Sequence, residues 1–253
     1  MPYPAHVSDA AYCYDGSYAG FLCCIFESYT RREIPSAVLG PAEGQITLFG
    51  TEAIATDPTH ARRVANGLMR LGPMVRERVM TGFLSTEEEK DLILLRFVRR
   101  CFDEGPRAVQ MLGDPDVHAA FVLERNVNNE VCRFIEFIRF EEKDGMLGSV
   151  IHPKNNVLPL LRGHFCSRLP DEDFLIFDAA PGTALLRQSG HVQYLAMEHY
   201  EPARDADELN WQALWKRFFH ALTIEERRNA KAQMNHAPKR FWGGMVEMRE
   251  PHI

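Results

Sequence analysis

One segment in the middle of the sequence constrains the fold most, because a helix-like stretch in it is flanked on both sides by strand-like stretches. A β-hairpin around Asp144 and Gly145 is predicted from the stretches FIEFIRFEEKDG and MLGSVIHP, because an Asp-Gly pair between apolar stretches is a strong hairpin signal. The following stretch, NNVLPLLRGHFCSRLP, predicts a short helix with Pro159 in its first turn.

After this helix, DFLIFDAAPGTALLRQSGHVQYL predicts two strands around a turn at Pro181 and Gly182, with a third strand after Gly190. The resulting ββαββ block predicts an α+β fold with a central, mainly antiparallel sheet. We expect the N-terminal and C-terminal helices to pack on that sheet.

Short elements and helices are predicted before the block. A strand ends at Tyr14, and Asp15 or Ser17 caps the helix that follows. Residues 33–45 are expected to form a loop, and ITLFGTEAIATD one or two short strands. The pair Asp57 and Pro58 starts a helix that runs to about residue 71.

Three more helices are predicted between this one and the central block. The first covers roughly residues 75–84. The second starts at Ser85 or Thr86, where Glu88 or Glu89 completes a capping box, and runs to about residue 102. Asp114 starts a long helix that runs to about residue 133.

The C-terminal part is predicted to be helical and basic. Five apolar residues recur at helical spacing and predict an apolar helix face: Trp211, Leu214, Trp215, Phe218 and Leu222. Thr223, with Glu226 three residues on, is expected to cap a further helix that ends before Pro238. We expect one compact domain over residues 1–253, with a helical part (about 1–130), the sheet block (about 134–200) and the basic part (about 208–253).

Composition places the chain among ordinary globular proteins. It has 253 residues, of which 45% are hydrophobic and 25% charged. The longest apolar run, Gly20 to Phe26, is too short to span a bilayer, and the first residues lack the features of a signal peptide. We expect a soluble, cytoplasmic protein with six reduced cysteines. Walker A, GxGxxG, HExxH and GxSxG motifs are absent, and no cofactor or metal is expected.

Charge is unevenly distributed along the sequence. Residues 211–253 carry eight Lys or Arg against four Glu, a local charge of +4, whereas the whole chain carries −6 and residues 1–210 therefore −10. Nucleic-acid binding by such a chain would need this local basic segment rather than its overall charge.

The helical part and the sheet block each contain one group of residues that are candidates for binding or catalysis. Asp15, Gly16 and Ser17 stand at a helix start, where free N–H groups could hold a phosphate, although a capping turn explains the same residues. In the sheet block, His164, Asp178 and Arg168 are candidate catalytic residues, since a histidine with a carboxylate partner suits acid–base chemistry. His152 and Arg162 stand nearby in the sequence, and a purely structural pairing of the same residues is the alternative.

The basic C-terminal segment holds the third group. Cations suit a phosphate chain and flat rings suit base stacking, so we predict nucleic-acid binding by this segment. The predicted residues are Arg227, Arg228, Asn229, Lys231, Lys239, Arg240, Phe241 and Trp242. Alternatively, the two aromatic residues of this group anchor the chain on the core.

The order of these motifs resembles a family of bacterial proteins described as DNA repair or DNA metabolism proteins and built on a domain of unknown function. The matching stretches are YDGSYAGFLCCIFESY, FIEFIRF, NNVLPLLRGHFCSRLP with FLIFD, and ERRNAKAQMNHAPKRFW. The resemblance supports these signature positions: Asp15, Gly16, Ser17, Arg139, Phe140, His164, Phe165, Arg168, Asp178, Arg228, Asn229, Pro238 and Arg240. It implies a radical-SAM partner protein resembling DNA photoproduct repair enzymes, and a relation to domains fused to uracil-DNA glycosylase superfamily members.

Three functions follow as hypotheses. In the first, the protein binds damaged or single-stranded DNA through its C-terminal segment and acts with the radical-SAM partner. In the second, it is itself an enzyme that uses His164, Asp178 and nearby arginines on a nucleotide or base lesion. In the third, it is an adaptor whose exposed aromatic residues bind a partner protein.

Overall fold

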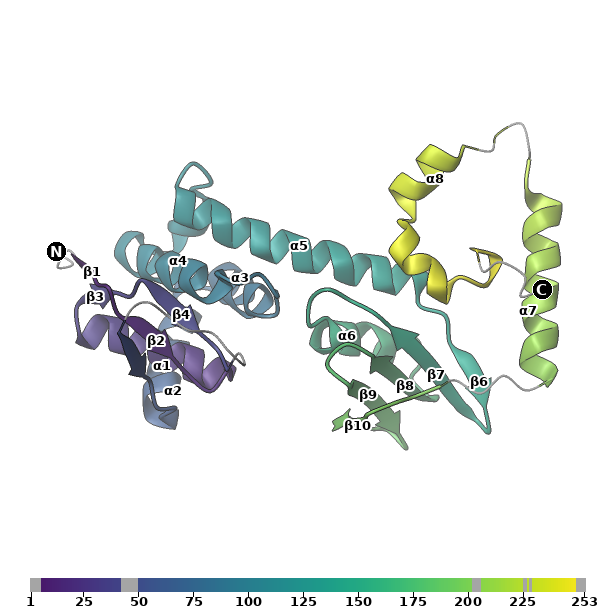
Figure 1. Cartoon of the computed structure of the whole chain (residues 1–253), viewed down its shortest axis with the longest axis horizontal. Helices are drawn as coiled ribbons and strands as arrows, with labels where there is room; N and C mark the ends of the chain where they lie inside the picture. The colour runs from purple at the N-terminus through teal and green to yellow at the C-terminus, as the bar shows by residue number, and fades with distance from the viewer. Residues whose placement is uncertain (1–5, 42–49, 202–205, 225–226, 228, 249–253) are drawn as a thin grey trace. The chain divides into compact units, whose positions relative to one another are not determined.

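The computed structural model describes residues 6–41, 50–201, 206–224, 227 and 229–248. Contacts within the chain group into two compact units, residues 1–128 and 129–253. The division falls close to the end of the first of the three parts recognised in the sequence. Each unit is described below by itself (Figure 1).

Unit 1 combines short strands with helices. Its elements are β1 (His6–Val7), β2 (Ala11–Cys13), α1 (Tyr18–Thr30), β3 (Glu33–Ile34), β4 (Ala37–Leu39), β5 (Thr51–Ala53), α2 (Pro58–Leu71), α3 (Pro73–Phe83), α4 (Lys90–Glu104), η1 (Pro106–Gln110) and the start of α5 (Pro115–Phe137). Within the described residues, β2 lies between β4 and β5 and pairs with both in parallel. Strands β1 and β3 form a second parallel pair.

The starts of helices α1 and α2 follow from their capping residues. Ser17 accepts a hydrogen bond from the Gly20 N–H at 2.9 Å, and Asp57 accepts from the N–H groups of Thr59 and His60. Each cap satisfies N–H groups that have no partner inside the helix. The predicted start and end of α2 are confirmed, and of the two caps proposed for α1 it is Ser17 that the structure selects.

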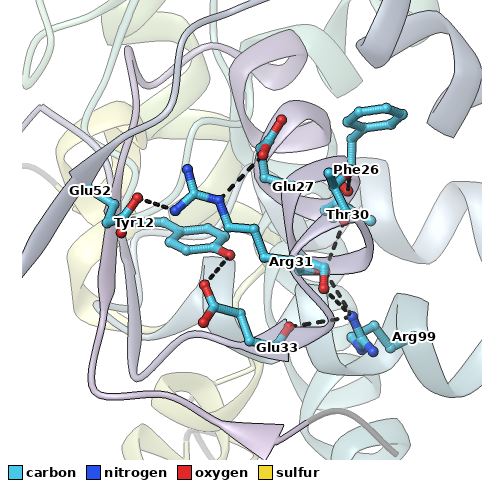
Figure 2. Close-up of polar contacts among 10 residues, drawn as sticks. Tyr12, Phe26, Glu27, Thr30, Arg31, Glu33, Glu52 and Arg99 are labelled. Carbon is cyan, nitrogen blue, oxygen red and sulfur yellow. Dashed lines mark hydrogen bonds and ion pairs between the residues drawn. The ribbon is translucent and has the colours of Figure 1, made fainter. Parts of the chain in front are cut away.

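A polar network joins α1 to the strands around it (Figure 2). The Tyr12 hydroxyl donates to Glu33 at 2.7 Å, and Arg31 forms ion pairs with Glu27 and Glu52. Arg99 on α4 donates to the carbonyl oxygens of Ser28 and Glu33. These contacts connect β2, β3 and β5 with two helices, and they explain the polar side chains here as structural.

Unit 2 contains the sheet that the sequence predicts. Its elements are the end of α5, then β6 (Glu141–Lys143), β7 (Met146–Ile151), α6 (Leu158–Arg168), β8 (Asp173–Asp178), β9 (Thr183–Gln188), β10 (His191–Ala196), α7 (Ala206–Leu222), α8 (Ala230–His236), η3 (Lys239–Gly244) and η4 (Val246–Met248). Among its described residues the strand order is β10-β9-β8-β7-β6, antiparallel except for the pair β7 and β8. The predicted α+β fold with a mainly antiparallel sheet is confirmed.

The parallel pair exists because α6 carries the chain from the end of β7 back to the start of β8 (Figure 1). Leu158, Leu161 and Phe165 are buried and repeat at helical spacing, so one side of α6 is apolar. Phe165 contacts the ring of Phe174 on β8, and Phe140 contacts both rings. The crossover therefore covers one face of the sheet.

The predicted hairpin turn is confirmed, but its first arm is shorter than predicted. Asp144 and Gly145 both have positive φ, at 51° and 77°, as a tight hairpin turn requires. FIEF, which the sequence analysis assigned to a strand, instead completes α5 as far as Phe137. Phe134 and Phe137 both contact Phe241, so packing of the helix end outweighs the strand propensity of these residues.

Three other sequence predictions need correction. The expected loop at residues 33–45 contains strands β3 and β4, because both find parallel partners far along the chain. Helix α4 begins at Lys90, after a turn in which Ser85 accepts from the Glu87 N–H, so the proposed capping box does not start it. The last predicted helix starts at Ala230, with Asn229 as its cap, whereas Glu226 lies outside the described residues.

In the part of the chain that is described, no helix could cross a membrane.

Candidate functional site

In the turn before α1, where the sequence suggested a phosphate site, the carboxylate of Asp15 accepts the hydrogen bonds. Asp15 accepts from the Ser17 N–H at 2.9 Å, from the Ser17 hydroxyl at 2.7 Å and from the Thr56 hydroxyl at 2.8 Å. These bonds lower the pKa of Asp15 below its usual range, the Ser17 hydroxyl contributing most. A Cβ at Gly20 would lie 2.3 Å from Asp15, so glycine is required for this close approach. Together with Gly16, which has positive φ, these residues form a capping turn that already contains its own anion.

Asp178 is the buried member of the three candidate catalytic residues. It ends β8 with 1% exposure, and its carboxylate accepts from the Ala180 N–H at 3.2 Å. Burial raises the pKa of Asp178 to about 6, although the Ala180 N–H and the charge of His152 act in the opposite direction. A carboxyl group that titrates near neutral pH can give and take a proton, which makes this the chemically most distinctive side chain of unit 2.

The other two candidates are not hydrogen-bonded to Asp178. His164 lies on α6 with its Nε2 buried and without a hydrogen-bond partner in the described part of the chain. Arg168 is exposed at the end of α6, and this end leads to the start of β8, whereas Asp178 lies at the other end of that strand. The histidine that faces Asp178 electrostatically is His152, which directly follows β7.

His152 and Asp178 lie at the same edge of the sheet because β7 and β8 are parallel. Ile151 pairs with Asp178 in the register, so the residue after β7 lies at the same sheet edge as the end of β8. Carboxyl edges of parallel strands are where side chains of open sheets most often converge on a ligand. The sequence places His152 next to a predicted strand but does not show which histidine lies at the sheet edge where Asp178 ends β8.

A second buried carboxylate, Glu130 on α5, fixes the loop between β7 and α6. It accepts from the backbone N–H groups of Lys154 and Asn155 at 3.0 and 2.9 Å, and from the Asn155 side chain at 2.7 Å. It also pairs with Arg240 at 3.1 Å. Arg240, predicted as a DNA contact, therefore anchors η3 to α5.

The two aromatic residues predicted for base stacking are held by the protein itself. Phe241 is 5% exposed and packs against Phe134 and Phe137. Trp242 is half-buried, and its indole N–H donates to the Ala237 carbonyl oxygen at 2.8 Å. Burial of Phe241 matches the anchoring alternative in the sequence analysis.

Several predicted cations remain accessible. Arg227, Lys231 and Lys239 are exposed and form no ion pair within the described residues, and Lys239 lies 5.8 Å from the Trp242 ring centroid. Asn229 caps α8 by accepting from the Ala232 N–H at 3.0 Å. Arg228 lies outside the described residues.

Three exposed aromatic side chains of unit 2 lie together on α7. The face that the sequence analysis recognised as apolar is largely open to solvent: Trp211 is 65% exposed, Phe218 54% and Trp215 42%. Trp215 is held in place because its indole N–H donates to Glu247 at 2.8 Å, and its ring lies 5.8 Å from that of Phe218. An amphipathic pattern ordinarily indicates a buried face, so the sequence alone could not reveal this exposure. We call Trp211, Leu214, Trp215, Phe218 and Leu222 the α7 face.

A pocket of about 210 Å³ lies in the same unit, bordered by the end of α5, by β7 and by η3. Arg139, His152 and Arg240 contribute polar groups, and Phe137 and Phe241 contribute apolar walls. Within the described residues, no group of three or more His, Cys, Asp or Glu side chains is arranged to hold a metal ion.

Fold and site together define an α+β protein whose C-terminal unit carries a five-stranded sheet, a small mixed-polarity pocket and an exposed aromatic helix face. Residues 88–247 match the family described as a domain of unknown function, DUF4130. This match covers more than half of the chain, so the chain belongs to that family. No curated protein and no solved structure matches it.

Proposed function

We propose that the protein is a DNA metabolism protein that binds single-stranded or damaged DNA through its C-terminal unit. The observation that carries this proposal is the exposure of Trp211, Trp215 and Phe218 on one side of α7, within the segment that has a local charge of +4. Each exposed ring can stack on a base of any type, since every base has a π-face. The resemblance of the motif order to DNA repair proteins supports the same proposal.

The cations needed for the phosphate chain lie in the same segment. Arg217 on α7 is exposed and forms no ion pair in the described part of the chain, as is also true of Lys231 and Lys239. Such side chains gain from phosphate contact without first breaking an internal ion pair, and binding releases counterions from the strand. This division of roles differs from the one predicted from sequence, because the rings come from α7 and not from η3.

The test is a titration of a labelled single-stranded oligothymidine, followed by fluorescence anisotropy. Trp211→Ala and Phe218→Ala should each weaken binding by about 5- to 150-fold, the range for loss of one stacked base. Tyr194→Ala is the control, because Tyr194 is an exposed ring on β10, 43% exposed, outside the basic segment. Equal affinity of all three variants and the wild type would refute the proposal.

A second candidate function is docking of a protein partner on the α7 face, which the resemblance would identify as the radical-SAM protein. It is favoured by Leu214 and Leu222, which are 52% and 64% exposed and cannot stack on bases. Contiguous exposed apolar side chains often mark protein interfaces. Leu214→Ser with Leu222→Ser should abolish co-purification with that partner and leave oligothymidine affinity within about twofold. If the double variant still co-purifies with the partner but loses oligothymidine affinity, DNA is favoured as the ligand of the α7 face.

A further inference from the structure

The pocket of unit 2 is small and partly aromatic. Its volume of about 210 Å³ is below the ~300–1,000 Å³ of sites for drug-sized ligands, so it suits one compact group. Phe134, Phe137 and Phe241 form apolar walls, and Phe241 is fixed by its contacts with the other two rings. Rigid aromatic walls favour a flat ligand that can pack against their rings.

The charges around the pocket favour a neutral ligand. Arg139 pairs with Glu208 at 3.0 Å, and Arg240 pairs with Glu130 at 3.1 Å. Both carboxylates are buried, and Glu141 lines the pocket as a further acidic residue. Because each lining arginine is already neutralised by a buried carboxylate, the pocket lacks the excess positive charge that would attract a phosphate group.

The same arginines retain hydrogen-bond donors. Arg139 donates to Glu208 through Nη2, while its Nε has no hydrogen-bond partner within the described residues. Arg240 uses Nη1 for Glu130. A guanidinium group has five N–H donors, so the remaining ones can serve an oxygen acceptor. A carbonyl oxygen supplies this acceptor without adding charge.

We propose that this pocket receives a neutral nucleobase with a ring carbonyl, swung out of the strand that the C-terminal unit binds. A nucleobase combines the required flatness, neutrality and carbonyl acceptor, and an extruded base is read in this way by ring contacts and polar edges. The pocket includes η3, the element that also carries the exposed Lys239. The inference rests on the proposed function for the source of the base, because the phosphate chain held beside the pocket presents it. A free nucleoside can reach the pocket without the chain.

The experiment measures binding of thymidine, which is uncharged, to the full-length protein by saturation-transfer NMR. Gly244→Leu places a side chain in the pocket, where a Cβ at this residue would lie 3.6 Å from the Phe137 carbonyl oxygen, an ordinary contact. Gly163→Leu is the matched control, since Gly163 on α6 has no atom within 4 Å of its Cβ position. We expect thymidine to bind the wild type and the control equally and to bind Gly244→Leu at least about tenfold more weakly.

Arg139→Lys gives a second, independent measurement if Gly244→Leu disturbs the fold. Lysine keeps the charge opposite Glu208 but lacks the planar set of donors, so thymidine binding should fall while the ion pair is retained. Arg133→Lys, in the exposed pair with Glu136, is its control. Inorganic phosphate should not displace thymidine. Absence of thymidine binding, equal binding by the pocket variants, or displacement by phosphate would overturn the inference.

Measurements of strand binding on the same samples separate this inference from the proposed function. If oligothymidine binds tightly and thymidine does not occupy the pocket, the pocket inference fails and the proposed function stands. If thymidine binds in the pocket but oligothymidine is not bound, the nucleobase pocket stands and the proposed function fails.

Discussion

Glu130 on α5 and Arg240 in η3 form an ion pair at 3.1 Å in which the glutamate side chain is 2% exposed and the arginine 42%. The same carboxylate accepts two backbone N–H groups from Lys154 and Asn155. One buried side chain thus joins the end of the long helix, the loop after β7 and the segment after α8. The same carboxylate therefore fixes η3 and the loop after β7, both of which adjoin the pocket.

Loss of the Glu130 charge should destabilise the protein. Glu130→Gln keeps the size of the side chain but weakens its bonds to the loop and to Arg240, so we expect the free energy of unfolding to fall by about 2 kcal/mol. Glu136→Gln on the same helix removes an exposed ion pair with Arg133 and should cost less than about 0.5 kcal/mol. Urea denaturation measures both, and equal losses would contradict the role assigned to Glu130.

Asp178 should make stability depend on pH. Its pKa is raised from the ordinary 3.8 to about 6, so the folded state holds the proton more tightly than the unfolded state. The stability from this group is present below the unfolded pKa and is lost as pH rises to about 6. Asp178→Asn should therefore be more stable than the wild type at neutral pH, by at most about 3 kcal/mol, and this difference should vanish near pH 4.

Urea denaturation across this pH range checks the prediction. Asp171→Asn provides the control, because Asp171 is exposed in the turn before β8. A gain for Asp178→Asn that does not change with pH would show that burial of the ionised carboxylate is not its cause.

The buried pair Tyr14 and Asp91 should contribute to the stability of unit 1. The Tyr14 hydroxyl donates to one oxygen of Asp91 at 2.9 Å, and the other oxygen has no hydrogen-bond partner in the described part of the chain. Tyr14→Phe should lower the free energy of unfolding by about 1–3 kcal/mol at neutral pH. Because burial raises the pKa of Asp91, the loss should shrink in acid as this carboxyl is protonated.

A double-mutant cycle with Asp91→Asn isolates the interaction between the two side chains. Tyr14→Phe should cost less in the Asp91→Asn background than in the wild type. Additive effects would indicate that the hydrogen bond contributes nothing of its own.

Salt dependence should identify the cations that contact DNA. If Arg217 and Lys239 each neutralise one phosphate of a single strand, replacing either by alanine should reduce the slope of log affinity against log salt concentration by about 0.7. Arg62→Ala is the control, since Arg62 is an exposed arginine of α2 in unit 1. If the variants and the wild type show the same slope of log affinity against log salt concentration, these two cations do not contact the strand.

The sequence predicted those elements whose signals are local. Asp57 with Pro58 predicted α2, and the Asp-Gly pair predicted the turn between β6 and β7. The strands β3 and β4 of unit 1 were not predicted because they pair with β1 and β2, which are not adjacent to them in the sequence. No local turn signal indicates such a pairing.

The candidate site was harder to predict, because burial of single side chains decides it. Phe241 and Trp211 have the same apolar character in the sequence, yet the first is buried against α5 and the second is exposed on α7. Likewise, the register of β7 and β8 places His152, rather than His164, at the sheet edge where β8 ends with Asp178. Tertiary packing supplies this information, and a hydrophobic pattern does not contain it.

The crossover through α6 also shapes how unit 2 acquires its structure. Each antiparallel pair of neighbouring strands in the sheet is joined by a tight turn, whereas the parallel strands β7 and β8 are joined through α6. Because this pairing closes the longest connection within the sheet, we expect it to be the last contact of the sheet to form. Since this pairing also places His152 and the end of β8 at one sheet edge, we expect that edge to be assembled only once the crossover is in place.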